Sequence, residues 1–320
     1  MSTRPAGLDE AVASLSAGTR RWVGLHAGYL DSPAARTELP VTPRVKALLQ
    51  LALLCHVRNR IGPADAALRE AAEVVERAWR RPEFPGLIAL DPRYARQFQL
   101  MYAALAPDRN AEEARRAARA RLAADGCLAP GGTSAYLQLE TRYYADLADI
   151  PHRLTSRQEL YERSVLAQSA AQPAAEPDVC EATHTVFYLS DFGFRDSGLT
   201  GEAREQAVRV VDRLTDRCVR HGAWDFIAKL LLAQYCLGVD PLSTPSGVAG
   251  VRALAGAMSP GGAIPGRSAA ERASATATPV AFFRQSYQAT LGAALAMLII
   301  TSGRAQGLST AGTSTVRGAL

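Results

Sequence analysis

The sequence predicts an all-α fold of about twelve helices arranged in antiparallel pairs, and three observations support this prediction. Ala, Leu, Arg and Glu, which favour helices, dominate the composition. No alternation of apolar and polar residues continues beyond about five positions, so the pattern predicts no strand. Charged, one-sided helices alternate along the chain with helices that are apolar on nearly every side.

This alternation predicts two layers of helices. The charged, amphipathic helices are expected at residues 8–30, 63–80, 110–125, 155–171 and 200–220. The apolar helices are expected at 42–61, 92–105, 133–147, 178–193, 223–237 and 280–300, with a short helix at 246–258. Outer–inner pairs that close into an α/α toroid or a related helical ring would bury the apolar helices on all sides. We therefore expect one helical domain over residues 1–300 and a flexible tail over 301–320.

Cap residues support several of these helix ends. Thr42 followed by Pro43 is typical of a helix N-terminus. Ser156 and Glu159 have the spacing of a capping box. Gly222 directly follows a predicted helix, at a position where glycine commonly ends helices.

The basic character of the chain does not indicate a nucleic-acid partner. The net charge is +5 and the pI about 9.1, but only Lys46 and Lys229 among the 36 basic residues are lysines. The arginines are spread along the chain, and the densest run lies beside acidic residues on a predicted helix (Arg115, Arg116, Arg119 and Arg121). This pattern is typical of a solvated helix face.

The cysteines and the apolar runs of the sequence predict the cellular compartment of the protein. Five cysteines without CxxC spacing argue against a disulfide framework and against a zinc ribbon. The N-terminus lacks the charged start and apolar run of a signal peptide. The longest uncharged apolar run, residues 289–300, is too short to cross a bilayer. We therefore expect a cytoplasmic protein with reduced cysteines and no membrane partner.

One predicted helix, residues 178–193, carries a polar stripe where a core helix is normally apolar. Glu181, His184, Tyr188 and Asp191 lie within an arc of about 80° at 3.6 residues per turn. Histidine suits proton transfer because its pKa lies near neutrality. We expect His184 to be the catalytic acid/base, with Tyr188 as a hydrogen-bond partner and Asp191 as an orienting group.

The same residues also fit a purely structural role. Asp178 and Glu181 have capping-box spacing, in which Glu181 would bond only the N-cap amide. His184 and Tyr188 could be buried groups with satisfied hydrogen bonds, and Asp191 could cap the helix or pair with an arginine. The sequence leaves this alternative open.

The pattern predicts no metal and no cofactor. Glu181 and His184 form one ExxH half of a carboxylate-bridged di-iron site, but the sequence has no second ExxH. His184 and Asp191 alone are too few ligands for zinc.

Polar residues on the other apolar helices are expected to line the same cavity. Burying them unpaired would cost roughly a few kcal/mol each. The predicted substrate-binding residues are Glu181, Tyr144, Trp224, Asp225, Gln234 and Tyr287. A ring centre filled with water explains the same pattern equally well.

Two segments resemble parts of the α/α-toroid enzymes, which include terpenoid cyclases and prenyltransferase β subunits. In Arg121–Tyr136 and in Val251–Arg267, a helix ends in a loop rich in Gly and Pro before the next inner helix. The chain lacks the DxDD and DDxxD motifs of the cyclases and a Cys/His/Asp zinc set. As a whole it resembles helical proteins of actinobacterial biosynthetic gene clusters.

These observations lead to two functional expectations. The first is a cofactor-independent enzyme of natural-product biosynthesis, of cyclase, isomerase or lyase type, acting on a small or peptidyl substrate in a central helical cavity. The second is a non-catalytic binding or scaffold protein for a peptide or a partner enzyme. A deep cavity at His184 would favour the enzyme, whereas a large exposed apolar patch would favour the scaffold. The sequence does not indicate an oligomeric state.

Overall fold

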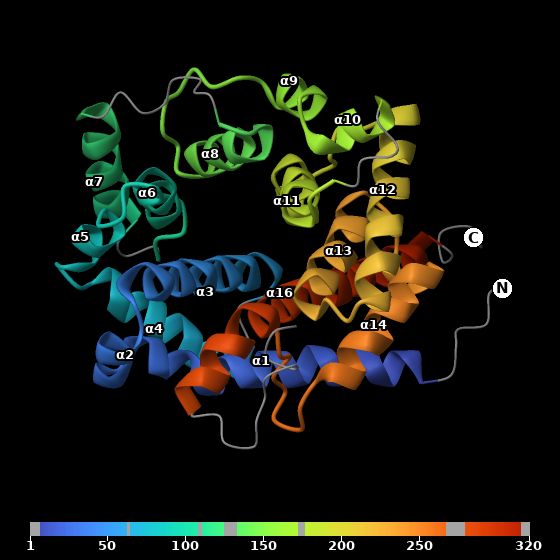
Figure 1. The fold of residues 1–320 in the computed structure, drawn as a ribbon, viewed down its shortest axis with the longest axis horizontal. Coiled ribbons are helices and arrows are strands. Elements are labelled where there is room, and N and C mark those ends of the chain that lie inside the picture. The colour runs from blue at the N-terminus through green and yellow to red at the C-terminus, as the bar shows by residue number, and fades with distance from the viewer. Residues whose placement is uncertain are drawn as a thin grey trace.

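The protein is all-α, as predicted. The computed structural model describes residues 7–62, 65–107, 111–124, 133–171, 177–266 and 279–314. These residues form fifteen α-helices and no strand (Figure 1).

Six helices contact one another in a closed cycle. They are α3 (Val41–Ile61), α6 (Ala95–Ala104), α8 (Ala135–Leu147), α11 (Val179–Ser190), α13 (Trp224–Cys236) and α16 (Pro279–Ser314). Each packs against the next in this order, and α16 packs against α3. We call them the ring helices, and they are the six helices predicted to form the inner layer. Figure 1 shows α3 lengthwise and α11 nearly end-on, so the axes of the ring helices are not all parallel.

Further helices cover the outside of this ring. They are α1 (Leu8–Asp31), α4 (Arg69–Trp79), α7 (Ala111–Ala124), α9 (Arg157–Glu162), α10 (Val165–Ala171), α12 (Gly201–Arg220) and α14 (Pro245–Ala257). Among their contacts, α1 packs on α16, α4 on α3, α7 on α6, α12 on α13, and α14 on both α12 and α1. The sequence explains the two layers, because α4 buries one face whereas α3 buries residues around its circumference.

The core of α3 shows how strongly the inner layer is held. Leu49, Leu51 and Leu54 are completely buried although they point in different directions around the helix. Burying each such side chain contributes about 1.5–3 kcal/mol. The ring helices are therefore fixed by neighbours on several sides.

Several helix boundaries differ from the prediction. The expected helix at 155–171 is broken into α9 and α10, and short helices α2 (Pro33–Glu38) and α5 (Phe84–Ile88) occupy expected connections. Ser156 and Glu159 form the predicted capping box. However, α3 begins at Val41 with Pro40 as its N-cap, two residues before the expected cap Thr42.

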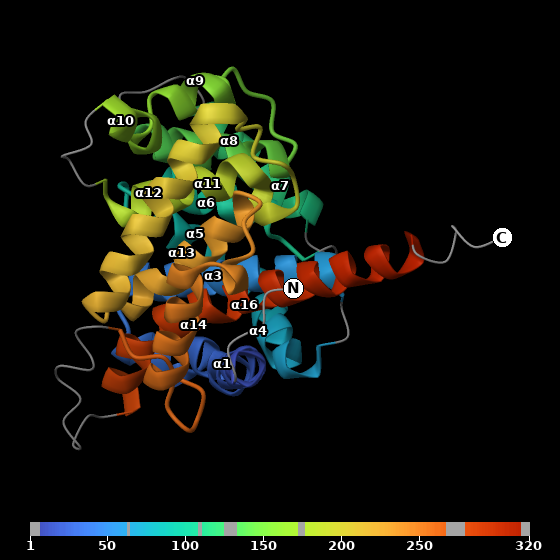
Figure 2. The same cartoon turned by 90° about the vertical axis from the view of Figure 1, so that its right-hand side faces the viewer.

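The last helix is longer than the prediction. The flexible tail was expected from residue 301, but α16 continues to Ser314, and residues 315–320 lie outside the described residues. Figure 2 shows the end of α16 projecting beyond the other helices. The four cysteines in the described part are all free, and Cys127 lies outside it. None of the described helices combines the length and the apolar character that crossing a membrane requires.

Candidate functional site

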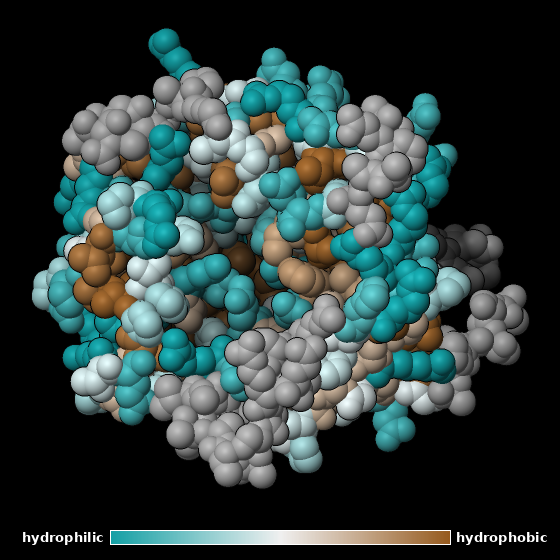
Figure 3. All heavy atoms as spheres, in the orientation of Figure 1, coloured by the Kyte–Doolittle hydropathy of each residue, from teal (hydrophilic) through white to brown (hydrophobic). Residues whose placement is uncertain are grey.

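Polar side chains from five ring helices meet inside the ring. We call them the central cluster: Lys46 of α3, Gln97 of α6, Tyr136 and Glu140 of α8, His184 and Tyr188 of α11, and Lys229 of α13. The imidazole of His184 lies nearly parallel to the rings of Tyr136 and Tyr188, with centroids 6.2 and 5.9 Å away. Figure 3 shows a recess in the middle of the face that Figure 1 also views.

His184 is held by the backbone of its own helix. Its Nδ1 lies 2.8 Å from the carbonyl oxygen of Cys180, and because a carbonyl only accepts, Nδ1 carries the hydrogen. Burial lowers the pKa of His184 to about 3, and the charges of Lys229 and Lys46 act in the same direction. The imidazole is therefore neutral at pH 7, and Nε2 is left as a hydrogen-bond acceptor.

Glu140 is the carboxyl group of the central cluster. Burial raises its pKa to about 7, against the opposing effects of a hydrogen bond from Tyr188, of the neighbouring Gln97 and of the charge on Lys46. At pH 7 this group populates both protonation states. A pKa matched to the working pH is what general acid/base catalysis requires.

Two phenols surround this carboxyl group. Burial raises the pKa of Tyr188 well above its usual value, and the neighbouring Glu140 adds to this effect through its charge and hydrogen bond. The phenol of Tyr188 is therefore a hydrogen-bond donor at neutral pH. Tyr144 is hydrogen-bonded to Tyr188, and their ring centroids are 6.0 Å apart in an edge-on contact. The structure thus brings two predicted residues, Tyr144 and Tyr188, into one site.

Both lysines of the chain act on the central cluster. Lys229 and Lys46 each lower the pKa of His184, and Lys46 also favours the charged form of Glu140. The Nζ of Lys229 lies 3.8 Å from the Sγ of Cys180. Every other basic side chain in the sequence apart from the histidines is an arginine, so the site contains all of the lysine amines in the protein.

The central cluster is deep yet partly accessible. Glu140, His184 and Lys229 are each only half-buried, although burial is the main cause of the pKa shifts of Glu140 and His184. In a close-packed core such side chains would have no accessible surface. Their residual accessibility shows that the neighbouring helices do not enclose these side chains completely.

Asp191 lies at the end of α11, where it joins two ring helices. Its carboxylate forms bonds of 2.9 Å with both terminal nitrogens of Arg60 and accepts a hydrogen bond of 2.9 Å from Tyr143. This ion pair ties the end of α3 to the end of α11. The contacts match the alternative of an arginine pair, and they do not bring Asp191 to His184 as its predicted orienting group.

The turn after α11 has an unusual backbone. Asp191 and Phe192 have φ values of 50° and 55°, and Gly193 follows with 87°. The left-handed region costs a non-glycine residue about 1–2 kcal/mol. The bonds to Asp191 and the burial of Phe192 hold this turn in place. The helix therefore stops at Ser190, and Asp191 leaves the polar stripe on which the sequence placed it.

Gln234 faces the outer layer instead of the predicted cavity. Its amide nitrogen donates to Thr215 at 3.2 Å and to Ser246 at 3.0 Å, and its oxygen accepts from Thr244 at 3.1 Å. These partners belong to α12 and to the start of α14. Gln234 is thus a fully satisfied buried residue between α13 and the outer helices.

Tyr287 also has a structural environment. It is buried beside Phe283 and Trp22, and its hydroxyl donates to the carbonyl of Ala47 at 3.3 Å. The prediction placed it in the substrate cavity, whereas the structure uses it to join α16, α1 and α3.

The last three predicted binding residues lie at helix starts. Trp224 and Asp225 begin α13, next to its connection with α12. The backbone N–H of Glu181 donates to the side chain of Asp178 at 3.0 Å, so Asp178 caps α11. The side chain of Glu181 is half-buried and lies close enough to Tyr136 to affect its pKa.

A comparison with protein families identifies the chain at the level of its family. A family model described as "Domain of unknown function (DUF6895)" matches residues 16–298. The chain belongs to this family. The matched region contains every residue of the central cluster. No curated protein and no solved structure matches the chain significantly. The resemblance to α/α-toroid enzymes therefore stays a prediction.

The sequence reasoning missed Glu140 and both lysines as site residues. Glu140 lies one turn after Tyr136 and one turn before Tyr144, on an inner helix, and this spacing was the available signal. The scarcity of lysine was a second signal, because Lys46 and Lys229 both fall on helices predicted to be inner. In the described part of the chain, no three His, Cys, Asp or Glu side chains are grouped so that they could hold a metal ion.

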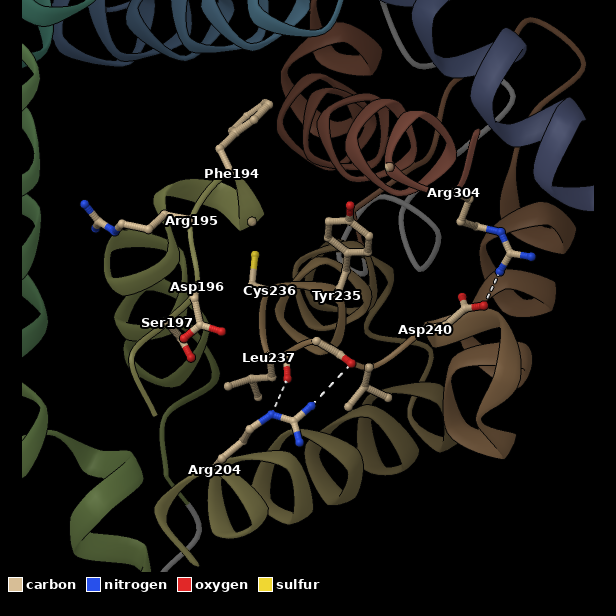
Figure 4. Close-up of a pocket in the computed structure, with 14 residues that line it drawn as sticks. Phe194, Arg195, Asp196, Ser197, Arg204, Tyr235, Cys236, Leu237, Asp240 and Arg304 are labelled. Atoms are coloured by element: carbon tan, nitrogen blue, oxygen red, sulfur yellow. Dashed lines mark hydrogen bonds and ion pairs between the residues drawn. The ribbon is translucent and has the colours of Figure 1, made fainter. Parts of the chain in front are cut away.

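A separate opening lies beyond the turn after α11 (Figure 4). This cleft has a volume of about 660 Å³ and is lined by residues of that turn, the end of α13 and α16. Its arginines already have structural partners. Arg204 donates to the carbonyls of Leu237 and Gly238 at the end of α13, and Arg304 pairs with Asp240. The central cluster has more perturbed titratable groups, so it is the stronger candidate for chemistry.

Proposed function

We propose that this chain is an enzyme that moves a proton on a small carbonyl-containing or anionic molecule bound at the central cluster. The observation that carries this proposal is the carboxyl group of Glu140, whose pKa of about 7 is set inside a ring that also directs both lysines of the protein at the same site. Shifts of this kind, produced by burial and specific charges in a hollow, are concentrated at catalytic sites.

Each residue has a distinct role in this proposal. Glu140 removes and returns the proton, and Tyr188 holds its carboxylate by a hydrogen bond. The ammonium groups of Lys46 and Lys229 stabilise negative charge that develops on the substrate oxygen. His184 is neutral and presents Nε2 as an acceptor to a substrate hydroxyl or amide.

His184 thus has a different role from the one that its residue type predicts. With a pKa of about 3, its imidazole is a weak base at neutral pH. An anionic ligand close to Lys229 and Lys46 would offset part of the effect that lowers this pKa. Substrate binding would then make His184 a stronger base than it is in the free enzyme.

The proposed reaction starts when a C–H bond of the substrate is broken. Glu140 takes a proton from the carbon next to a carbonyl, and the electrons of the C–H bond move to the oxygen to form an enolate. Return of the proton to a different carbon gives isomerisation. Loss of a leaving group on the neighbouring carbon gives elimination, and attack on an electrophile in the same molecule gives cyclisation. A role in natural-product biosynthesis is supported by the resemblance to helical proteins of such gene clusters, and the chemistry needs no cofactor.

A solvent-exchange experiment tests the proposal without a known substrate. The purified protein is incubated in D₂O with a small-molecule extract of its native cells, and mass spectrometry follows uptake of deuterium at carbon. We expect at least one metabolite to gain deuterium or to be converted with the wild type. Glu140→Gln keeps the size of the side chain but cannot take up a proton, so the signal should be lost.

A matched control variant distinguishes a loss of catalysis from a loss of folded protein. Glu162 is exposed and lies outside the ring, on α9, so Glu162→Gln should retain the signal. If Glu140→Gln labels the same metabolites at the same rate as the wild type, the proposed role of the cluster is wrong.

The scaffold alternative has less support. A docking protein would be expected to show a contiguous exposed apolar patch. The large apolar side chains exposed in the described residues are Leu25, Leu90, Tyr94 and Phe194, of which only Leu90 and Tyr94 are close in sequence. Phe194 lies under the guanidinium of Arg60 at 3.8 Å and so is already packed.

A further inference from the structure

A small pocket outside the ring contains a buried arginine without a counter-ion. The pocket lies between α2, α3, the end of α4 and α5, and it has a volume of about 210 Å³. Apolar side chains, among them Val45, Leu48 and Phe84, form one part of its wall. Three arginines and one glutamate form the other part: Arg36, Arg44, Arg81 and Glu83.

Arg44 is the exceptional member of this group. Only 7% of its surface is exposed, which is rare for an arginine that has no paired acid. Its Nε is buried and has no hydrogen-bond partner among the described residues, and no carboxylate in them forms an ion pair with its guanidinium. Burial lowers the pKa of Arg44, and the charges of Arg36 and Arg81 lower it further.

The acids around the pocket do not neutralise this charge. Asp31 is paired with Arg81 at 2.7 Å and with Arg77 at 3.1 Å. Glu83 influences Arg44 only through its charge, and its side chain is exposed to solvent. Counting Arg36, Arg44 and Arg81 against Asp31 and Glu83 leaves a net charge of +1 at the pocket. Burying a charge without a partner lowers the stability of the folded protein by roughly several kcal/mol, and a bound counter-ion would remove this cost.

We propose that this pocket binds a small anion with a short apolar tail, whose carboxylate or phosphate contacts Arg44 and whose tail lies against Val45, Leu48 and Phe84. A planar guanidinium matches the two oxygens of such a group. The volume of the pocket corresponds to about seven water-sized groups. A six-carbon chain is therefore a suitable probe.

The pocket is distinct from the central cluster, although one helix serves both. Arg44 and Lys46 lie two residues apart on α3, which places them about 200° apart around the helix axis. One face of α3 therefore carries the guanidinium of the pocket, and the opposite face carries the amine of the central cluster. This inference does not depend on the proposed enzymatic function.

Isothermal titration calorimetry with three probes tests the proposal on the full chain. Hexanoate and hexyl phosphate carry the anionic group, and hexanol carries the tail alone. We expect the wild type to bind at least one of the two anions. The anion with the higher affinity then shows whether the pocket prefers a carboxylate or a phosphate. Hexanol should bind at least about tenfold more weakly, because a hydrogen-bonded charge pair contributes about 1.5–3 kcal/mol.

Variants locate the binding. Arg44→Met keeps much of the apolar stem, and removing an unpaired buried charge should not unfold the protein. We expect its affinity for the anions to fall about tenfold or more. Arg209→Met is the matched control, because Arg209 is exposed on α12 and paired with Glu205. This control should bind like the wild type.

Glu83→Gln tests the competing explanation that Glu83 itself is the counter-ion of Arg44. If the pocket awaits an external anion, removing the negative charge of Glu83 should tighten hexanoate binding a few-fold. Unchanged or weaker binding by Glu83→Gln would contradict the proposal. Failure of both anions to bind the wild type, or equal affinity in Arg44→Met, would also overturn it.

Discussion

Two buried polar regions of this molecule look alike in the sequence and differ in the structure. The first is the central cluster. The second lies between α13 and the outer helices, where Gln234 is bonded to Thr215, Ser246 and Thr244. We call this second group the outer network. The amide of Gln234 has partners for both its nitrogen and its oxygen, and Ser246 also donates to the carboxylate of Asp212.

The central cluster differs from the outer network in its ionisation and accessibility. It contains ionisable groups of both signs, the pKa values of Glu140 and His184 are far from their usual range, and their side chains are partly accessible. Buried polarity alone therefore does not mark a site, because a satisfied network contributes only stability and specificity. Perturbed ionisation combined with residual accessibility is the more informative sign.

The largest expected difference between the two regions is in catalysis. Removing a general acid/base lowers a rate by about 10²–10⁴. In the deuterium-exchange assay, Glu140→Gln should therefore lose the signal, whereas Gln234→Leu should keep at least half of it in the fraction of protein that remains folded. If the two variants lose the deuterium-exchange signal to a similar extent, the central cluster and the outer network do not differ in catalysis.

A change in the outer network should lower the stability of the protein more than it lowers activity. Gln234→Leu removes the three hydrogen bonds of the amide, although Thr215, Ser246 and Thr244 keep their bonds to Val211, Asp212 and Pro241. Each lost bond contributes about 0.5–1.5 kcal/mol, so we expect a total loss of about 2–4 kcal/mol. Urea denaturation followed by circular dichroism measures this loss. An unchanged midpoint would mean that the network contributes nothing.

The pH dependence of stability distinguishes two members of the central cluster. The pKa of Glu140 is raised from 4.5 to about 7, so its contribution to stability is present below pH 4.5 and is lost as the pH rises to 7. The pKa of His184 is lowered from 6.5 to about 3, so its contribution is present above pH 6.5 and is lost as the pH falls to 3. Between pH 4.5 and 6.5 the two effects oppose each other.

Single variants should separate these effects. Relative to the wild type, Glu140→Gln should gain stability as the pH rises from 4.5 to 6.5, by about 2 kcal/mol. His184→Gln should lose a similar amount over the same interval. Urea denaturation across this pH range measures both differences, and two flat difference curves would show that neither pKa is shifted.

The smallest expected effect is at Asp191. Asp191→Asn keeps a side chain that tolerates the left-handed conformation but removes the charge that binds Arg60. Because the pair is partly exposed, we expect a loss of about 1 kcal/mol in urea denaturation and little change in deuterium exchange. A loss of exchange activity as large as that of Glu140→Gln would restore the catalytic role that the sequence predicted for Asp191.

Much of the fold could be predicted from the sequence. The six ring helices were identified by their apolar character on nearly every side, because only an inner position can bury such a surface. The break between α9 and α10 and the extension of α16 to Ser314 were missed. The residues from 301 to 314 are rich in Gly, Ser and Thr, which favour helices weakly, so propensity pointed away from a helix there.

The site was predicted in part, and the errors have two causes. The sequence places His184 and Tyr188 on one stripe, and the structure confirms that they lie together. Gln234 and Tyr287 were expected in the cavity, but a helix that is apolar on all sides gives no indication of which side faces the ring centre. Glu140 was missed for the same reason, since its direction depends on how α8 is rotated against α11. Asp191 left the stripe because of a left-handed turn, which local hydrogen bonds and the tertiary contacts of Asp191 with Arg60 and Tyr143 stabilise.

The most direct test of the central claim is a pH titration of Glu140 followed by the ¹³C shift of its side-chain carboxyl group. The signal is assigned by its absence in Glu140→Gln. A midpoint near pH 7 is expected if the ring interior holds a carboxyl group ready for proton transfer. A midpoint at the usual value of about 4.5 would show that this group is an ordinary solvated acid and would contradict the account.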